Sequence, residues 1–323
     1  MVIDSQDMLS VLEAFPAQCR NALTLSKGIV VSKDIGNVVV TGMGGSAIGG
    51  DLLKSYLAKT DLPVFVNRDY NIPNFVNENT LVFAVSYSGN TEETLSAVQQ
   101  AKEKNAKIIG ITSGGRLEKE VQTKIKVPTG FQPRAAICYL FFPMLGVLYN
   151  SGMIDVKNTD LNAMLKRLAN FSYYREQGSK LAKVINGKTP IIYSSELLAP
   201  VAYRFKTQIN ENAKYPAFTG VFSEMNHNEI NAFESMDRNK FVVLLLRDQQ
   251  DHPRIKKRMD VCRDIISNRV NVEDVVVEGD SLLERMFSTI HLGDIASYEL
   301  ALLNRVDPSP VDVIEGLKKR LKE

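Results

Sequence analysis

Two kinds of segment alternate along this chain of 323 residues. Short, continuous apolar runs predict strands buried on both faces, and longer runs with an apolar residue every three or four positions predict amphipathic helices. The predicted strands cover residues 38–41, 64–66, 81–85, 107–111, 190–193, 241–246 and 272–277. The predicted helices cover residues 5–27, 46–57, 92–104, 135–150, 160–185, 200–212, 253–267, 281–304 and 311–322.

The alternation of strands and helices predicts an α/β fold in which parallel sheets carry helices on both faces. A short polar stretch at residues 152–158 interrupts the series, and the same order of elements then begins again. We therefore expect a duplicated, doubly wound α/β unit. Its first domain would cover residues 1–152 and its second residues 153–323, with a last helix after Pro308-Ser309-Pro310.

Composition narrows the class of protein. Hydrophobic residues make up 44% of the chain and charged residues 24%, as in ordinary globular proteins. A net charge of +2 without a long basic run leaves no surface of the kind that binds nucleic acid. The chain starts without a signal-peptide pattern, and its longest apolar run, residues 135–149, is shorter than the ~20 residues of a membrane span. The three cysteines lie far apart and fit neither a disulfide framework nor a metal site, so we expect a cytoplasmic protein with reduced thiols.

The most informative motif is Ser86-Tyr87-Ser88-Gly89-Asn90-Thr91, between the predicted strand 81–85 and the predicted helix 92–104. The first N–H groups of a helix have no partner within the helix, and the helix dipole favours an anion beside them. Serine and threonine add hydroxyl donors without bulk. The motif therefore predicts a phosphate site at the carboxyl end of a strand, where ligands bind in doubly wound sheets.

A second loop at a strand end is rich in glycine: Gly42-Met43-Gly44-Gly45-Ser46. It resembles a dinucleotide fingerprint, which also requires an acidic residue at the end of the next strand. Asp69 is a possible match, but it comes three residues after the predicted strand 64–66. The loop could equally be a tight turn without a ligand, with Ser46 as a helix N-cap. A third loop, residues 112–117, is either a contact for a sugar hydroxyl or only a turn.

Three side chains are candidates for chemistry. Arg134 precedes the apolar helix and either pairs with a surface acid or supplies a fixed charge that stabilises an oxyanion. His227 lies in a polar loop between apolar segments, which suits an acid–base group. Glu211 ends the predicted helix 200–212, and a solvated glutamate is the default interpretation of any single glutamate.

Taken in order, these blocks resemble the bifunctional phosphoglucose/phosphomannose isomerase family, which is built from two sugar isomerase (SIS) domains with a flavodoxin-like fold. The hydroxyl-rich loop alone marks only an SIS domain, and the later blocks narrow the resemblance to the isomerases. The matching blocks are Gly44-Gly45-Ser46, residues 86–94, Thr112-Ser113-Gly114-Gly115, Pro133-Arg134-Ala135-Ala136, Asn210-Glu211-Asn212 and Asn226-His227-Asn228-Glu229.

The resemblance implies a role for each matching residue. Arg134 would steady an enediolate, Glu211 would move a proton between C1 and C2, and His227 would open the sugar ring from the partner subunit of a homodimer. Lys318, with Lys319 adjacent, matches a lysine that assists ring opening. Ser309 is the candidate for a hydroxyl linked to mannose 6-phosphate. The residues that would hold the 6-phosphate are Gly45, Ser46, Ser86, Ser88 and Thr91.

The implied reaction interconverts glucose 6-phosphate and mannose 6-phosphate with fructose 6-phosphate through a cis-enediol. One carboxylate near both carbons suffices for the proton transfer, and no metal or other cofactor is required if an arginine stabilises the oxyanion. The alternatives are a non-catalytic SIS protein that binds a sugar phosphate, an isomerase for another phosphosugar, and a dinucleotide-dependent oxidoreductase that rests only on the glycine-rich loop.

Overall fold

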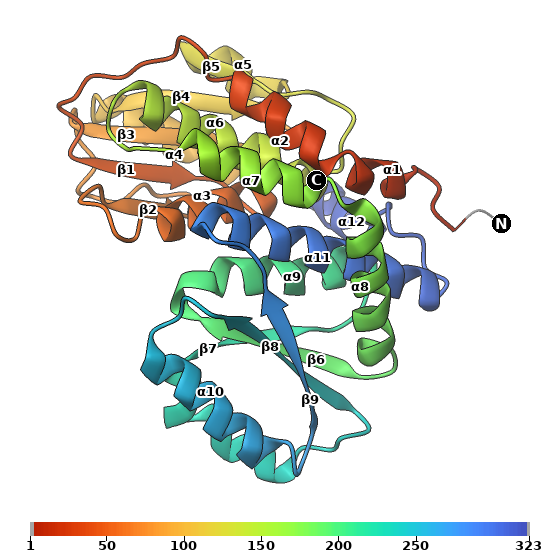
Figure 1. The fold of residues 1–323 in the computed structure, drawn as a ribbon. Helices are drawn as coiled ribbons and strands as arrows, with labels where there is room; N and C mark the ends of the chain where they lie inside the picture. Colours follow the sequence, from red (N-terminus) through yellow and green to blue (C-terminus); the bar gives the residue numbers. More distant parts are fainter. Residues whose placement is uncertain (1–2, 322–323) are drawn as a thin grey trace. The chain divides into compact units, whose positions relative to one another are not determined.

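The computed structural model describes residues 3–321, which divide into two compact units (Figure 1). The N-terminal unit consists of residues 14–169 and 281–284. The C-terminal unit consists of residues 170–280 and the described parts of residues 1–13 and 285–323. Each unit contains a parallel sheet, which confirms the predicted class of two doubly wound α/β domains. Residues 153–169, which the sequence places in the second domain, lie in the N-terminal unit.

The sheet of the N-terminal unit has the strand order of the flavodoxin-like fold. In chain order its strands are β1 (Asn37–Thr41), β2 (Val64–Asn67), β3 (Thr80–Val85), β4 (Lys107–Thr112) and β5 (Thr123–Lys126). All pair in parallel, and their order in space is β2-β1-β3-β4-β5 (Figure 1). The order reverses between β1 and β3, so their connections leave toward opposite faces and open a crevice at the carboxyl edge.

Helices cover both faces of this sheet, which explains why its central strands β1 and β3 are buried, continuous apolar runs. The helices of the unit are α2 (Phe15–Thr24), α3 (Gly45–Tyr56), α4 (Glu92–Glu103), α5 (Gly115–Glu120), α6 (Ile137–Asn150) and α7 (Asn158–Leu168). On one face Val39 of β1 packs in a cluster with Ala97 and Ala101 of α4. On the other face Val40 lies against Gly50 of α3. Successive residues of a strand thus face opposite helical layers.

The sheet of the C-terminal unit repeats the arrangement of the first. Its strands are β6 (Thr189–Ser195), β7 (Phe218–Phe222), β8 (Phe241–Asp248) and β9 (Asn271–Val277), all parallel. Their order in space, β7-β6-β8-β9, matches that of the first four strands of the other sheet. Helix α10 (Pro253–Ile266) packs its Met259 and Cys262 against β6 and β8. The order supports the predicted duplication.

The other helices of the C-terminal unit complete its layers. They are α1 (Met8–Glu13), α8 (Phe171–Ile185), α9 (Ala199–Asn212), α11 (Leu282–Leu303, from Arg285 onward) and α12 (Asp312–Arg320). Helix α9 packs on β6, and Figure 1 draws it on the side of the sheet opposite α10. The predicted last helix extends to Lys322, which lies outside the described residues.

Two predicted helices were wrong in extent. The predicted helix 5–27 is broken at Ala14 into α1 and α2, where Pro16 occupies the first turn of α2 and has no N–H to continue an earlier helix. The predicted helix 160–185 is broken between α7 and α8, where the side chain of Asn170 caps α8 by accepting from the N–H of Tyr173. Apolar periodicity continues across both breaks and therefore conceals them. The pattern also missed the short elements α5, β5 and β7.

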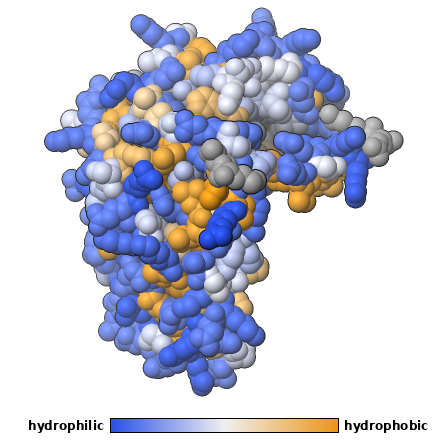
Figure 2. All heavy atoms as spheres, turned by 90° about the vertical axis from the view of Figure 1, so that its right-hand side faces the viewer, coloured by the Kyte–Doolittle hydropathy of each residue, from blue (hydrophilic) through white to orange (hydrophobic). Residues whose placement is uncertain are grey.

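Burial explains the longest apolar run in the sequence. Helix α6 contains it, and Phe141 and Phe142 are fully buried inside the N-terminal unit, as predicted for this run. Within residues 3–321 no helix is both long enough and apolar enough to cross a membrane. The face drawn in Figure 2 is mostly hydrophilic, with hydrophobic residues confined to smaller areas.

The close packing of α3 on α6 gives a test of this fold. A Cβ atom added at Gly49 would lie 2.6 Å from the carbonyl oxygen of Leu140, so the two helices must move apart. We expect Gly49→Ala to lower the free energy of unfolding by about 1–3 kcal/mol in urea denaturation followed by circular dichroism. Gly36→Ala is the control, because nothing lies within 4 Å of its added Cβ. Equal unfolding midpoints for the two variants would contradict the packing.

Candidate active site

The hydroxyl-rich loop connects β3 to α4 at the switch point of the N-terminal sheet. The hydroxyls of Ser86 and Thr91 lie 2.8 Å apart, and Ser86 Oγ also accepts from the N–H of Gly89 at 3.1 Å. Thr91 is the N-cap residue of α4 but makes no side-chain cap to it. The hydroxyls therefore shape the loop and leave the first turn of α4 uncapped by a side chain, as an anion site requires. Ser88, by contrast, is exposed.

The glycine-rich loop lies directly beside the hydroxyl-rich one. A Cβ atom at Gly42 would lie 2.7 Å from the carbonyl oxygen of Val85, the last residue of β3. Gly44 has φ of +52°, which favours glycine, and buried Ser46 stands in the first turn of α3. The phosphate-binding candidates of both loops thus share the carboxyl edge of β1 and β3.

The third loop braces the hydroxyl-rich loop. Ser113 directs both its hydroxyl and its N–H to the carbonyl oxygen of Tyr87, at 2.6 and 3.0 Å. A Cβ atom at Gly89 would lie 1.8 Å from the carbonyl oxygen of Gly114, so only glycine fits at this contact. These contacts favour the interpretation of residues 112–117 as a turn over that of a sugar contact.

Arg134 stands next to the glycine-rich loop. It lies in a 3₁₀ turn, Pro133–Ala136, before α6 and is only 3% exposed, with Nη1 3.4 Å from Oε1 of Gln132. A Cβ atom at Gly45 would lie 3.3 Å from the carbonyl oxygen of Pro133 and 3.5 Å from Cα of Arg134. This burial speaks against a surface ion pair and favours a fixed positive charge beside the loops.

Glu211 occupies the last turn of α9 in the C-terminal unit and is half-buried. The chain after it is held by Lys214, whose φ is +50°. Lys214 Nζ donates to the carbonyl oxygens of Asn212, at 3.3 Å, and of Asp307, at 2.6 Å. The end of α9 is thereby tied to the segment before α12. The sequence did not indicate Lys214, because a contact 93 residues away leaves no local pattern.

His227 is exposed on an anchored 3₁₀ turn, Glu224–His227. The preceding Asn226 donates to Sγ of Cys262 at 2.8 Å and accepts from Nη1 of Arg258 at 3.3 Å. Burial raises the pKa of the Cys262 thiol, which keeps it protonated. The imidazole therefore projects from a turn whose other side chains are fixed.

The following turn is fixed by Glu229. Its carboxylate accepts from the hydroxyl of Tyr193 at 2.7 Å. Burial raises the pKa of Tyr193, and the hydrogen bond and charge of Glu229 raise it further, so the phenol stays a donor. Both sides of His227 are thus held to the body of the C-terminal unit.

Ser309 and Lys318 occupy contrasting environments near the end of the chain. Ser309 is buried, and its N–H donates to Oδ1 of Asp307 at 3.0 Å. Burial alone would raise the pKa of Asp307, but hydrogen bonds from Ser5 and Ser309 lower it. Lys318, the matching residue, and the adjacent Lys319 are both exposed on α12.

The two units carry different candidate residues. The N-terminal unit brings the predicted phosphate-binding residues and Arg134 to one edge of its sheet. The C-terminal unit holds Glu211 at the end of α9, His227 on its turn, and Ser309 and Lys318 in its last segment. Among residues 3–321 no group of three or more His, Cys, Asp or Glu side chains lies close enough to hold a metal ion.

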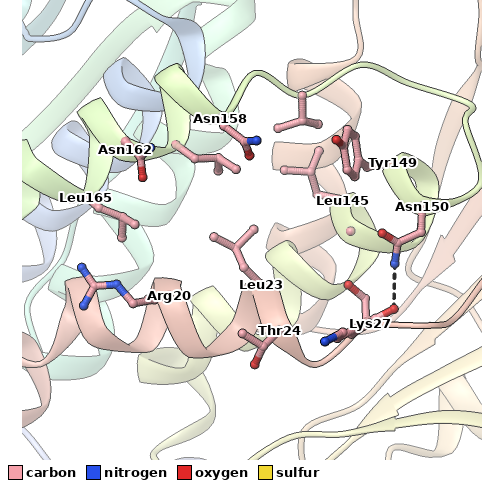
Figure 3. Close-up of a pocket in the computed structure, with 14 residues that line it drawn as sticks. Arg20, Leu23, Thr24, Lys27, Leu145, Tyr149, Asn150, Asn158, Asn162 and Leu165 are labelled. Carbon is pink, nitrogen blue, oxygen red and sulfur yellow. Dashed lines mark hydrogen bonds between the residues drawn. The ribbon is translucent and has the colours of Figure 1, made fainter.

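A cavity of about 560 Å³ lies elsewhere in the N-terminal unit, between α2, α6 and α7 (Figure 3). Leu23, Leu145 and Leu165 line its apolar part, and Asn150 closes one end by donating to the carbonyl oxygen of Ser26 at 2.8 Å. It contains none of the candidate residues. The strand-edge loops, with their hydroxyls and buried arginine, are therefore a better candidate for a phosphate ligand than this cavity.

Comparison with known proteins agrees with this geometry. Residues 33–149 match the SIS domain, and residues 175–321 match the bacterial phospho-glucose isomerase C-terminal SIS domain. The C-terminal domain of glucosamine-fructose-6-phosphate aminotransferase from Francisella tularensis has the same fold, with a TM-score of 0.71 at 15% identity, over 94% of this chain and 98% of that one.

Two sequence relatives bear on the reaction. The bifunctional phosphoglucose/phosphomannose isomerase of Caldicellulosiruptor bescii is 45% identical over 95% of this chain and 97% of the relative. The D-glucosamine-6-phosphate 4-epimerase of Sulfolobus acidocaldarius is 33% identical over 92% of each. Because several relatives of the first kind are 39–45% identical over 88–95% of this chain, the chain belongs to the bifunctional phosphoglucose/phosphomannose isomerase family.

Proposed function

We propose that this protein interconverts glucose 6-phosphate and mannose 6-phosphate with fructose 6-phosphate, without a metal or other cofactor. The observation that carries the proposal is the hydroxyl-rich loop between β3 and the first turn of α4, which no side chain caps, with buried Arg134 beside the adjoining loop. The half-buried carboxylate of Glu211 supplies the base that an isomerase needs and a binding protein does not.

The 6-phosphate is the anchor of the substrate. Ser86, Ser88 and Thr91, together with Gly45 and Ser46, would donate to its oxygens, and the first turn of α4 would face its charge. Interactions at this unreactive end contribute binding energy that fixes the reacting carbons. The loops take no part in proton transfer.

Ring opening precedes isomerisation. His227, assisted by Lys318, would pass the proton of the O1 hydroxyl to the ring oxygen, so that the C1–O5 bond breaks and a C1 aldehyde forms. We propose that His227 reaches this site from the second subunit of a homodimer in the cytoplasm. Its exposure on an anchored turn suits a side chain that serves a neighbouring subunit.

Glu211 would then carry a proton between neighbouring carbons. The carboxylate removes the proton from C2, and the charge that develops on O1 is stabilised by Arg134. The proton returns to C1 while the O2 proton moves to O1, which leaves a C2 ketone. C2 is planar in the enediol, so rotation about C2–C3 would let one base serve both epimers. Ser309 is the proposed hydroxyl for mannose 6-phosphate.

Removal of the base tests the mechanism. We expect Glu211→Gln to lower kcat by about 10²- to 10⁴-fold, because the amide cannot accept the C2 proton, while KM changes less than about threefold. A coupled assay with fructose 6-phosphate measures both constants. Glu176→Gln, a substitution of an exposed glutamate on α8, is the control and keeps full activity. Full activity of Glu211→Gln would remove this residue from the mechanism.

The phosphate site is tested by a change that removes one hydroxyl and keeps the shape. Hydrogen bonds to a charged group contribute about 1.5–3 kcal/mol, so Thr91→Val should raise KM for both aldose phosphates by roughly 10- to 100-fold. The inhibition constant of inorganic phosphate should rise in parallel. The exposed Thr159→Val on α7 is the matched control. An unchanged KM and phosphate inhibition constant would place the anchor elsewhere.

Metal removal separates this proposal from metal-assisted isomerisation. Enzyme dialysed against EDTA should turn over glucose 6-phosphate and mannose 6-phosphate, offered separately, at the rates of untreated enzyme. Strict dependence on an added divalent metal would contradict the proposed proton shuttle. Binding of both substrates without turnover of either would instead favour a non-catalytic SIS protein, and turnover of a different phosphosugar alone would favour a changed specificity.

A further inference from the structure

Two charged side chains are completely buried between α9 and α11 in the C-terminal unit. Nη2 of Arg204 lies 2.6 Å from Oδ2 of Asp294, and the side chains are only 1% and 4% exposed. Taking two charges out of water costs several kcal/mol per ion before their attraction offsets it. Apolar residues of similar volume often fill such a place with equal stability. The pair therefore suggests a purpose other than stability.

The pair is the first member of a polar row on α9. Arg204, Gln208 and Asn212 are spaced by four residues and so lie along one stripe of the helix. With its oxygen toward the guanidinium, the Gln208 carboxamide accepts from Nη1 and Nη2 of Arg204 at 3.0 Å. In the opposite orientation it accepts from Nδ2 of Asn212 at 3.1 Å. The carboxamide therefore lies within hydrogen-bond distance of both Arg204 and Asn212 and bonds one of them in each orientation.

Asn212, at the other end of the row, makes a second contact with α11. Nδ2 of Asn212 donates to Oγ of Ser297 at 2.9 Å, and Ser297 Oγ donates to the carbonyl oxygen of Asp294 at 2.6 Å. The helices approach closely beside the Arg204–Asp294 pair, because a Cβ atom at Gly293 would lie 2.8 Å from Cγ of Phe205. The row is thus tied to α11 at both ends.

Glu211 sits at the end of this row. It is the residue before Asn212 and follows Arg204 by seven positions, which is nearly two turns and leaves only about 20° between their directions. A rotation of α9 by one residue turns every side chain by about 100° and would swing Glu211 away from its present direction. Apolar contacts tolerate sliding better than hydrogen bonds, which are directional.

We propose that Arg204, Gln208 and Asn212, held by Asp294 and Ser297, are positioning residues that fix the rotation of α9 and thereby aim the carboxylate of Glu211. The inference rests on the proposed role of Glu211 as the base. Proton transfer depends steeply on alignment, and a misplacement of 1 Å can cost about 10²-fold in rate. The residues proposed to bind the phosphate belong to other elements than α9.

The test replaces the buried pair by apolar residues of similar volume. We expect Arg204→Met combined with Asp294→Leu to keep the circular dichroism spectrum and KM within about twofold while kcat falls roughly 10- to 100-fold. The matched control is Arg285→Met with Asp248→Leu, which removes another buried pair of the same unit, 2.9 Å apart. The control should keep kcat within about twofold of the wild-type value.

A kinetic isotope effect separates positioning from general damage. With deuterium at C2 of glucose 6-phosphate, a misaligned base makes proton transfer more rate-limiting, so the isotope effect on kcat should rise in the double variant. A folded double variant with wild-type kcat and isotope effect overturns the proposal. If that variant does not fold, Gln208→Met, which removes only the bridging amide, should lower kcat about three- to tenfold with the same rise in isotope effect, and wild-type values there overturn it.

The two proposals fail in different experiments. Turnover by the wild-type protein and its loss in Glu211→Gln are measured first in the same assay, and they test the base itself. An active wild type with an inactive Glu211→Gln, but an unaffected double variant, contradicts only the positioning role. An equal loss of kcat in the control pair would also contradict it, because any buried ion pair of the unit would then matter as much.

Discussion

The site in the N-terminal unit depends on the parallel pairing of β1 with β3, neighbours in space but not in sequence. Their connections leave toward opposite faces, so two loops meet at one edge with the first turns of α3 and α4 beside them. The loops approach so closely that Gly42 lies against the end of β3, and Gly89 has no room for a side chain. The shape of the backbone thus gathers N–H groups and short hydroxyl side chains at one edge, where we propose that the phosphate binds.

The C-terminal sheet repeats the strand order, yet its own switch point is occupied by charged residues of the chain. Asp248, at the end of β8, pairs with Arg285 at 2.9 Å, and both are buried. Asp251 follows in the same loop, and burial raises its pKa, with the charge of Asp248 adding to the effect. Buried carboxylates at this place disfavour a phosphate. The duplicated fold can therefore divide the proposed work, with substrate anchored by one unit and proton transfer served by the other.

The sequence predicted those features that depend on local chemistry. The strands of both sheets other than β5 and β7 were found because they are apolar runs, and the loop after β3 was found because hydroxyls and glycine precede a helix. The helix breaks at Ala14 and Asn170 were not predicted, because the periodicity of apolar residues continues through them. The polar row along α9 was not predicted for a different reason. Arg204 and Asp294 are 90 residues apart, and the sequence of neither helix alone indicates that they are in contact.

The two units solve different positioning problems. An anion site can be built from N–H groups and short hydroxyls, whose places follow from the turn itself, so glycine and serine suffice. A glutamate on a helix is different, because its direction changes with any rotation of the helix and apolar packing resists rotation only weakly. Directional contacts must then come from neighbouring side chains, as Asn212 and Lys214 provide at the end of α9. The turn of His227 has the same need, met by Asn226 and Glu229. Directional side-chain contacts therefore hold both segments that carry the groups proposed to move protons.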